Sequence, residues 1–224
     1  MTQYPDTETY LVSYCWGSCG SFISSLIYDF LFEYEPIIPF SEAGNSHNRA
    51  VSCSKNWSVR PTATLSKRLF LQGKGIYNFV SPLNPNKPLI MLDHNFPNFD
   101  ELFSIYPKCK VIVISITPSD IPRVKGNLFY KVLEPDGILT EFNPNDKFRV
   151  ADNFMNVNVT YSGEHSDNIT VLPIYDIIHC KKKTLSLLSQ ITGKPITEKI
   201  VGIYDDYIAA QENLVRTKMP WVKV

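Results

Sequence analysis

The sequence lacks an excess of charge of either sign, since 22 lysines and arginines balance 22 aspartates and glutamates. A balanced chain creates no overall field that would draw it to nucleic acid or to an anionic membrane surface. We therefore expect neither as a partner, and any anion site must be built locally. The lysine run at 181–183 predicts only a solvated helix surface, because no aromatic platform for bases accompanies it.

The sequence also lacks any hydrophobic run close to the roughly 20 residues that a membrane-spanning helix needs. Its first residues have neither the basic nor the apolar region of a secretory signal. No acidic pair or histidine cluster has the spacing of metal ligands, and the five cysteines include no C-x-x-C pair: Cys15, Cys19, Cys53, Cys109 and Cys180. This odd, scattered set predicts reduced thiols, no bound metal and a cytoplasmic location. Cys15 and Cys19 flank a turn, where packing and a regulatory disulfide are both open readings.

Residues 10–34 read as a strand, a turn of small residues and a helix, in that order. The apolar run at 10–15 is broken by Gly17 and Gly20, and apolar side chains then recur at three- and four-residue spacing from Phe22 onward. The unpaired amides and the positive dipole end of such a helix would face an anion in the turn. The alternative is a strand-to-helix turn whose glycines serve backbone geometry alone.

The turn is not a Walker A loop. That loop needs four residues between its glycines and a lysine before the Ser or Thr, whereas Gly17 and Gly20 enclose two residues and the first basic residue is Arg49. No carboxylate is evidently placed to hold magnesium. A nucleotide or nucleoside kinase is therefore disfavoured.

Strands and helices alternate along the rest of the chain. We expect strands at 76–80, 88–92, 110–115 and 169–173, and helices at 62–71, 99–106, 118–133, 180–191 and 197–215. Residues 35–60 read as a long surface loop, and two short strands are expected around Phe148 and Val157. Alternation of this kind predicts right-handed βαβ units. The chain should therefore form a single α/β domain over 1–224, with three α/β/α layers and a mainly parallel sheet.

Polar residues follow three of the expected strands directly. In a parallel α/β sheet, the residues just past the carboxyl ends of the strands line the ligand crevice. That rule selects 13–21, 93–95 and 115–120 as neighbours in space.

The order of these pieces resembles the sulfotransferases, which move a sulfuryl group from 3′-phosphoadenosine 5′-phosphosulfate to an alcohol or amine. Ser13-Tyr14 with Cys19-Gly20-Ser21-Phe22 is similar to the family's first phosphate-binding loop. The run Leu89–His94 resembles its apolar strand ending in histidine, and Lys110–Asp120 resembles a later strand and turn. The tail, Thr192–Pro195 before a tyrosine-rich helix, is similar to the helical end of bacterial, algal and viral members.

The resemblance implies a P-loop-like fold and a metal-free sulfotransferase activity that uses this phosphosulfate nucleotide as donor. His94 falls on the family's catalytic base, and the acceptor would be a hydroxyl of a small molecule or saccharide. The donor-binding residues that the resemblance or the strand-end rule selects are Ser18, Cys19, Gly20, Ser21, Phe22 and Ser115, and Arg123 is added as a possible substitute for the family's missing basic groups. Read without the family, His94 is a strand-end histidine bonded to a loop carbonyl.

Three of the family's anion-binding groups are replaced in this chain. Ser18 stands at the loop lysine or arginine, Ile116 at the arginine of the 3′-phosphate site and Val124 at its partner serine. Each lost charge-assisted contact weakens binding by about 1.5 to 3 kcal/mol, so donor binding needs a substitute, for which Arg123, Lys125 and the basic residues of the long loop are the candidates. The alternative is a sulfotransferase-fold protein that has lost donor binding and serves as a binding or structural component, for example of a virus particle. The sequence does not fix the oligomeric state.

Overall fold

Five parallel strands form the centre of the protein. The computed structural model describes residues 8–15, 17–31, 59–61, 88–93, 99–130, 141 and 167–222. The strands lie in the order β2-β3-β1-β4-β5, and every neighbouring pair is parallel. Their bounds are Thr9–Ser13 for β1, Val59–Pro61 for β2, Leu89–Asp93 for β3, Lys110–Ser115 for β4 and Ile169–Pro173 for β5.

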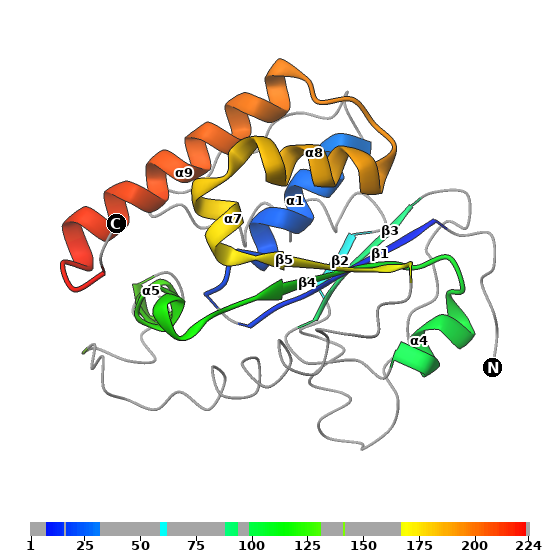
Figure 1. Ribbon diagram of the computed structural model, residues 1–224, viewed down its shortest axis with the longest axis horizontal. Helices are drawn as coiled ribbons and strands as arrows, with labels where there is room; N and C mark the ends of the chain where they lie inside the picture. Colours follow the sequence, from blue (N-terminus) through cyan, green and yellow to red (C-terminus); the bar gives the residue numbers. More distant parts are fainter. Residues whose placement is uncertain are drawn as a thin grey trace.

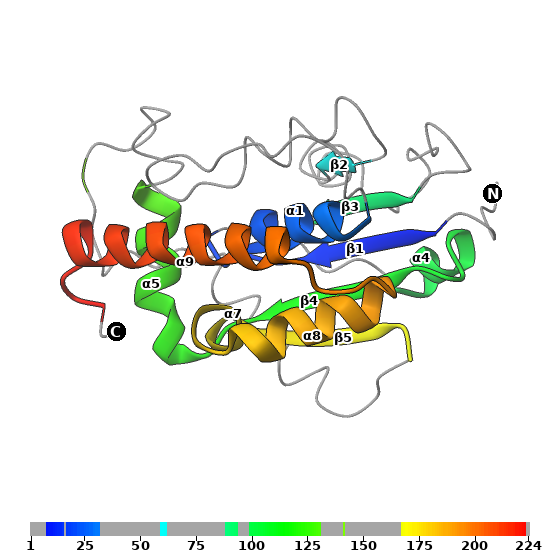
Figure 2. The ribbon, with the colours of Figure 1, turned by 90° about the horizontal axis from the view of Figure 1, so that it is seen from above.

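Helices cover both faces of this sheet. The upper layer in Figure 1 consists of α1 (Gly20–Leu31), α7 (Ile174–His179), α8 (Lys181–Thr192) and α9 (Glu198–Lys218). On the opposite face lies α4 (Phe99–Ile105), and α5 (Ile121–Leu128) stands at the end of the sheet where β4 leads into it, beside α9 in both ribbon views (Figures 1 and 2). The predicted three-layer α/β fold with a parallel sheet is therefore confirmed.

Two hydrophobic cores follow from the alternation of side chains along the strands. Tyr10 and Val12 of β1 face the core beneath α1, α8 and α9, whereas Leu11 between them faces the core beneath α4. The same alternation divides Ile112 and Ile114 from Val111 and Val113 in β4. Because both faces are covered, the central strands are apolar throughout, as the sequence led us to expect.

The boundaries of several predicted elements are confirmed. The strands at 110–115 and 169–173 have the expected bounds, and the final helix begins after Thr197, whose hydroxyl accepts the Ile200 amide at 3.4 Å. Gly193 ends α8 with a φ of 67°, the left-handed conformation that a glycine adopts without a steric penalty.

Two interpretations of the sequence were wrong. Residues 59 and 60 were assigned to a surface loop, but Val59–Pro61 is β2, paired with β3 at the sheet edge. The segment 174–179, which was left between the strand at 169–173 and the helix at 180–191 without an assignment, is the separate helix α7. A three-residue edge strand and a six-residue helix are too short for hydrophobic periodicity to reveal. The predicted elements at 62–71 and 76–80 and around Phe148 and Val157 lie outside the described residues.

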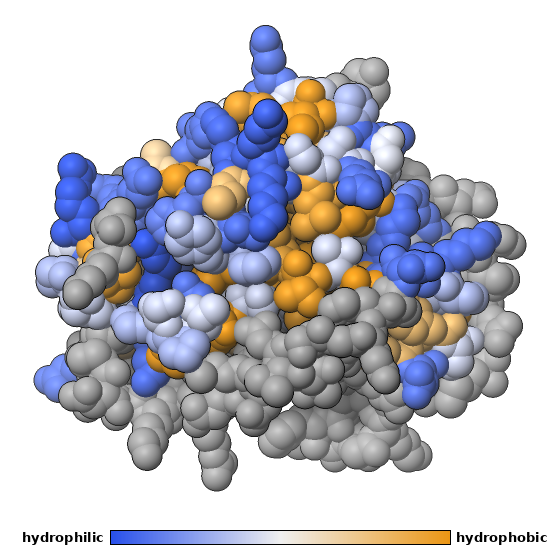
Figure 3. Space-filling view, viewed as in Figure 1, coloured by the Kyte–Doolittle hydropathy of each residue, from blue (hydrophilic) through white to orange (hydrophobic). Residues whose placement is uncertain are grey.

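The outer helices present a mostly polar surface. Figure 3 shows hydrophilic residues over much of the face that carries α8 and α9, with hydrophobic side chains visible between them. Ion pairs join this layer, since Lys181 contacts Asp205 at 2.8 Å and Lys183 contacts Asp176 at 2.7 Å. Within the described part of the chain, no helix has the length and apolar character needed to cross a membrane.

Candidate functional site

Three of the predicted polar segments start from one edge of the sheet. Ser13 at the end of β1 pairs in register with Asp93 of β3 and with Val113 of β4. Ser115 ends β4 beside Pro173 of β5 and is almost fully buried. The expectation that these strand ends meet is therefore confirmed. His94 follows β3 directly but lies outside the described residues, so its role as a base stays a prediction.

The loop between β1 and α1 is a tight, buried turn. The Ser18 amide donates a hydrogen bond to the Cys15 carbonyl at 3.1 Å, and the Ser18 hydroxyl donates to the same oxygen at 2.6 Å. Gly17 has a φ of 87°, and Cys19 has a φ of 69°, in the left-handed region that side chains other than glycine rarely adopt. The strained backbone at Cys19 lies directly before the first helical residue, at the point predicted to hold an anion.

The start of α1 has the geometry of an anion site, but a side chain lies over it. The Ile23 amide donates the first intrahelical bond, to Cys19 at 3.1 Å, so the amides of residues 20–22 have no acceptor within the helix. The Tyr14 ring packs directly on Gly20, where a Cβ would come within 1.9 Å of the ring. The Tyr14 and Ser21 hydroxyls are 3.1 Å apart and hydrogen-bonded. The second glycine of the turn therefore makes room for Tyr14.

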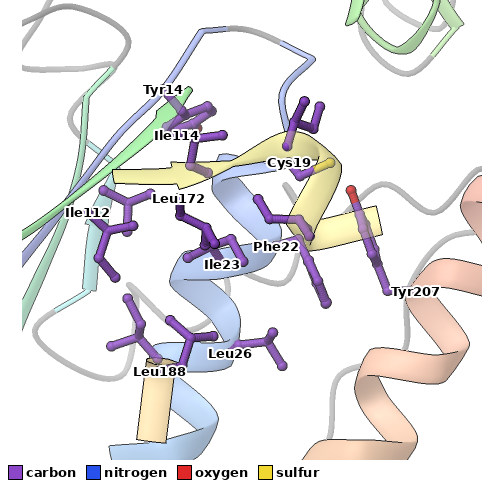
Figure 4. Packing of buried hydrophobic residues seen from close by; sticks show 14 of the residues in the cluster. Tyr14, Cys19, Phe22, Ile23, Leu26, Ile112, Ile114, Leu172, Leu188 and Tyr207 are labelled. Atoms are coloured by element: carbon purple, nitrogen blue, oxygen red, sulfur yellow. The ribbon is translucent and has the colours of Figure 1, made fainter. Parts of the chain in front are cut away.

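The final helix packs against the first turn of α1. The Phe22 ring stacks on the Tyr207 ring with centroids 3.6 Å apart and planes 7° apart. Figure 4 shows the Tyr207 hydroxyl at the end of its ring nearest Cys19. Burial raises the pKa of Tyr207 well above its ordinary value, the Cys19 side chain raises it further, and the positive charge of Arg123 opposes them. Tyr207 is therefore a neutral phenol at physiological pH, and Arg123 lies close enough to act on it.

The helix α5 covers the other side of the loop. The Asn127 side-chain amide donates to the Gly17 carbonyl at 3.1 Å. A Cβ on Gly17 would lie 2.2 Å from the Val124 carbonyl oxygen, so only a glycine allows the two backbones to approach this closely. The loop is thus held between α5 and α1, and Val124 contacts it through its backbone at Gly17 and through its side chain in the buried cluster.

Arg123 is the most unusual side chain at this site. Only 7% of its surface is exposed, yet its Nη1 atom has no hydrogen-bond partner. Among the described residues, no carboxylate forms an ion pair with it. An unneutralised guanidinium in a low-dielectric interior is costly, and proteins keep such charges where a ligand of opposite charge binds.

The structure thus brings most of the predicted donor-binding residues together. Ser18 to Phe22 form the turn and the first residues of α1, and Arg123 is on α5, whose Asn127 donates to the Gly17 carbonyl of the same loop. Sequence reasoning overlooked the part played by Asn127 and Tyr207. The spacing of four between Arg123 and Asn127, which places both on one face of a helix, was the available signal for Asn127. In the described part of the chain, no group of three acidic, histidine or cysteine side chains is arranged for a metal.

The buried thiols provide a test of how closed this loop is. Burial raises the pKa of Cys15 from about 9 to about 12, and burial likewise raises that of Cys109. Because the thiolate is the reactive form, we expect Cys15 to be alkylated about a thousandfold more slowly near neutral pH than an exposed thiol. Native alkylation followed by peptide mass mapping measures this, with the partly exposed Cys180 as the internal reference.

Rapid labelling of Cys15 would contradict the closed loop.

The raised pKa of Cys15 also predicts that the stability of the protein falls as the pH rises from about 9 towards 12, because the unfolded chain loses the Cys15 proton first. Below pH 9 this contribution is fully present, and urea unfolding at several pH values reports it.

Comparisons with known proteins found matches among solved structures alone. No protein-family model matches the chain, and the search of curated proteins found no matching sequence. Among solved structures, a sulfotransferase domain from the curacin biosynthetic pathway aligns with 91% of this chain and 79% of its own, at 15% identity and a TM-score of 0.46. A sulfotransferase from Mycobacterium tuberculosis aligns with 95% of this chain and 76% of its own, at 11% identity and a TM-score of 0.44.

A third structure, a sulfotransferase from Alicyclobacillus acidocaldarius, aligns with 97% of this chain and 98% of its own, at 11% identity and a TM-score of 0.37. At these TM-scores the likeness carries no argument about activity. Any function must therefore be argued from the chain's own residues.

Proposed function

We propose that this chain binds 3′-phosphoadenosine 5′-phosphosulfate at the loop between β1 and α1. The bound donor supplies an activated sulfuryl group for transfer to a hydroxyl of a small molecule or saccharide. The buried thiols Cys15 and Cys109, which form no disulfide, suit a reducing cytoplasm as the place where the protein works.

The observation that carries this proposal is the buried Arg123. Its Nη1 atom has no partner, and its charge acts on Tyr207, which stacks on Phe22 at the start of α1. A phosphate or phosphosulfate oxygen accepts a charge-assisted hydrogen bond from a guanidinium, worth roughly 1.5 to 3 kcal/mol. Arg123 thereby offsets part of what the chain lost when Ser18 replaced the family's basic loop residue.

The first turn of α1 adds a second attraction for the same anion. The helix is 12 residues long, and its amides at 20–22 precede the first intrahelical bond. Such amides and the helix dipole favour negative charge. The Tyr14 ring packs on Gly20 and its hydroxyl is bonded to Ser21, so an anion at this turn would have to displace that ring.

His94 is the residue that we assign to proton transfer. It directly follows β3, whose last residue, Asp93, pairs in register with Ser13 beside the loop. A histidine titrates near neutral pH and can take a proton from an acceptor hydroxyl. Residues that directly follow the strands of a parallel sheet commonly line its ligand crevice, which supports this assignment.

A second candidate function is favoured by the contacts inside the loop. The Ser18 hydroxyl is bonded to the Cys15 carbonyl, and the Ser21 hydroxyl is bonded to Tyr14. Both predicted hydroxyl ligands are therefore already satisfied within the protein. A chain that kept the fold but gave up donor binding, to serve as a binding or structural component, would have this arrangement.

Nucleotide binding decides between the two candidates. Calorimetric titration with 3′-phosphoadenosine 5′-phosphate at low salt is expected to give micromolar binding to the natural protein. Ser21→Lys, which crowds the loop, should abolish it. Labelled sulfuryl transfer to a panel of phenol and saccharide hydroxyls then tests the activity, and His94→Ala should lower that rate by about 10²-fold to 10⁴-fold without changing nucleotide affinity.

His179→Ala is the matched control for the histidine. His179 lies on α7 and packs on Tyr175, outside the proposed site, so its removal should leave the transfer rate unchanged. No heat and no thermal shift with the nucleotide would reject the enzyme and leave the second candidate. Binding without transfer to any acceptor would point to a nucleotide-binding component.

A further inference from the structure

Two unsatisfied polar atoms on α5 lie on the same side of the helix. Arg123 and Asn127 are four residues apart, a spacing that stacks side chains on one face. Both are at least nine-tenths buried, with 7% and 1% of their surfaces exposed. Arg123 has an unpartnered donor, Nη1, and Asn127 has an unpartnered acceptor, Oδ1.

The orientation of the Asn127 amide is fixed by its neighbour. Its Nδ2 atom donates to the Gly17 carbonyl at 3.1 Å. Turning the amide over would place two acceptors against each other, so Oδ1 must be the atom left without a partner. A buried acceptor without a hydrogen bond is destabilising, and so is a buried donor. One unpartnered donor and one unpartnered acceptor on the same helix face indicate a ligand that forms a hydrogen bond with each of them.

We propose that Arg123 and Asn127 together form a subsite for a phosphate group that still carries a hydroxyl. An ionised phosphate oxygen accepts from Nη1 of Arg123, and a hydroxyl on or beside the phosphate donates to Oδ1 of Asn127. Asn127 is then the residue that sets specificity. The hydrogen bond from Asn127 to Gly17 uses only Nδ2, so it does not account for the acceptor Oδ1 at this position.

This subsite should discriminate between phosphate and sulfate, two anions of similar size and shape. At about pH 8 inorganic phosphate is mainly a dianion that retains one proton, whereas sulfate is a dianion with none. Sulfate can therefore bond to Arg123 but leaves Asn127 Oδ1 facing another acceptor. A site that hydrogen-bonds a ligand hydroxyl rejects the analogue that lacks it, because its own buried group is left unpaired.

The inference deepens the proposed function, because it concerns the same loop, but it does not need the nucleotide to be the ligand. Inorganic phosphate and sulfate are sufficient probes. A preference for phosphate without nucleotide binding would reject the proposed donor and keep the subsite. Nucleotide binding without that preference would keep the donor and reject the subsite.

The experiment is a paired titration of the full chain with sodium phosphate and sodium sulfate at equal ionic strength and about pH 8. Binding is measured by thermal shift and by calorimetry. We expect phosphate to bind at least about tenfold more tightly than sulfate, the size of one buried hydrogen bond to an unpaired group. Asn127→Leu, which has a similar volume and no acceptor, should bring this ratio close to one. Asn213→Leu, at an exposed asparagine on α9, should leave it unchanged.

The ratio is measured within each variant, so a loss of stability alone does not imitate the result. Equal affinity of the natural protein for the two anions overturns the proposal without any variant. A phosphate preference that persists in Asn127→Leu, with the variant shown to be folded, overturns the role of Asn127.

A nucleotide can offer the donor hydroxyl only from its ribose, because a phosphate monoester is a dianion without a proton at about pH 8. Adenosine 3′,5′-bisphosphate and its 2′-deoxy analogue differ only in the ribose hydroxyl beside the 3′-phosphate. A weaker affinity of the deoxy compound, lost in Asn127→Leu, assigns the contact with Asn127 to that hydroxyl, and equal affinity of the two compounds excludes the ribose hydroxyl as the donor.

Discussion

Gly17→Ala is expected to destabilise the protein by about 3 to 5 kcal/mol. Two penalties add at this position. The φ of 87° is strained for any side chain, and the new Cβ would lie 2.2 Å from the Val124 carbonyl oxygen and 3.1 Å from the Leu128 amide nitrogen. Both obstructing atoms are backbone, so relief requires α5 to move away from the loop. Urea unfolding measures the change.

Two other glycines provide matched controls. Gly193 also has a positive φ, of 67°, but a Cβ there meets nothing within 4 Å, so Gly193→Ala should show the conformational strain alone, about 1 kcal/mol. Gly202 lies inside α9 with open space around it, and Gly202→Ala should stabilise by roughly 0.5 to 1 kcal/mol. If Gly17→Ala cost no more than Gly193→Ala, the close contact between the loop and α5 would be wrong.

The sequence predicted the layers of this fold because they depend on local patterns. The run Lys110–Ser115 is β-branched and apolar on both sides, as a central parallel strand must be, and its bounds were predicted correctly. Gly193 and Thr197 carry their own stop and start signals for α8 and α9. Each of these residues determines its structure through neighbours within a few positions.

The contents of the candidate site could not be predicted in the same way. Tyr14 reads as the end of a strand, and nothing local shows that its ring comes back over Gly20. Asn127 and Gly17 are separated by 110 positions in the chain, and only the packing of α5 on the loop brings them together. The stacking of Phe22 on Tyr207 likewise joins the first helix to the last. Contacts of this range depend on the sheet order, which periodicity does not reveal.

These long-range contacts bear on the proposed anion site, whose loop contains no lysine. The family pattern places the positive charge in the loop itself, at the position that Ser18 occupies. In the proposed site the cation is Arg123, which comes from α5, and the loop supplies backbone amides and a short approach at Gly17. A charge supplied by another element is compatible with the strand, turn and helix order that resembles the family.

Arg123→Met is expected to remove anion binding while leaving the free protein as stable as before or more stable. Without its guanidinium the site loses a charge-assisted hydrogen bond, so affinity for phosphate and for 3′-phosphoadenosine 5′-phosphate should fall by roughly 10-fold to 150-fold. The free protein at the same time loses a buried charge whose Nη1 atom has no partner. A methionine of similar length fills the space without that penalty, so the free energy of unfolding should stay level or rise by about 1 kcal/mol or more.

Arg216→Met separates this effect from the general loss of one positive charge. Arg216 is an exposed arginine on α9, bonded to Asn213 at 3.0 Å, and its replacement should change neither affinity nor stability by more than about 0.5 kcal/mol. The opposite signs expected for Arg123→Met distinguish the two possible roles of the buried arginine. A residue kept for packing destabilises the protein when it is replaced and leaves ligand binding intact. Replacing a residue that is kept for a ligand removes ligand binding and leaves the protein as stable or more stable. Its unsatisfied charge destabilises the free protein and is compensated only when the anion binds.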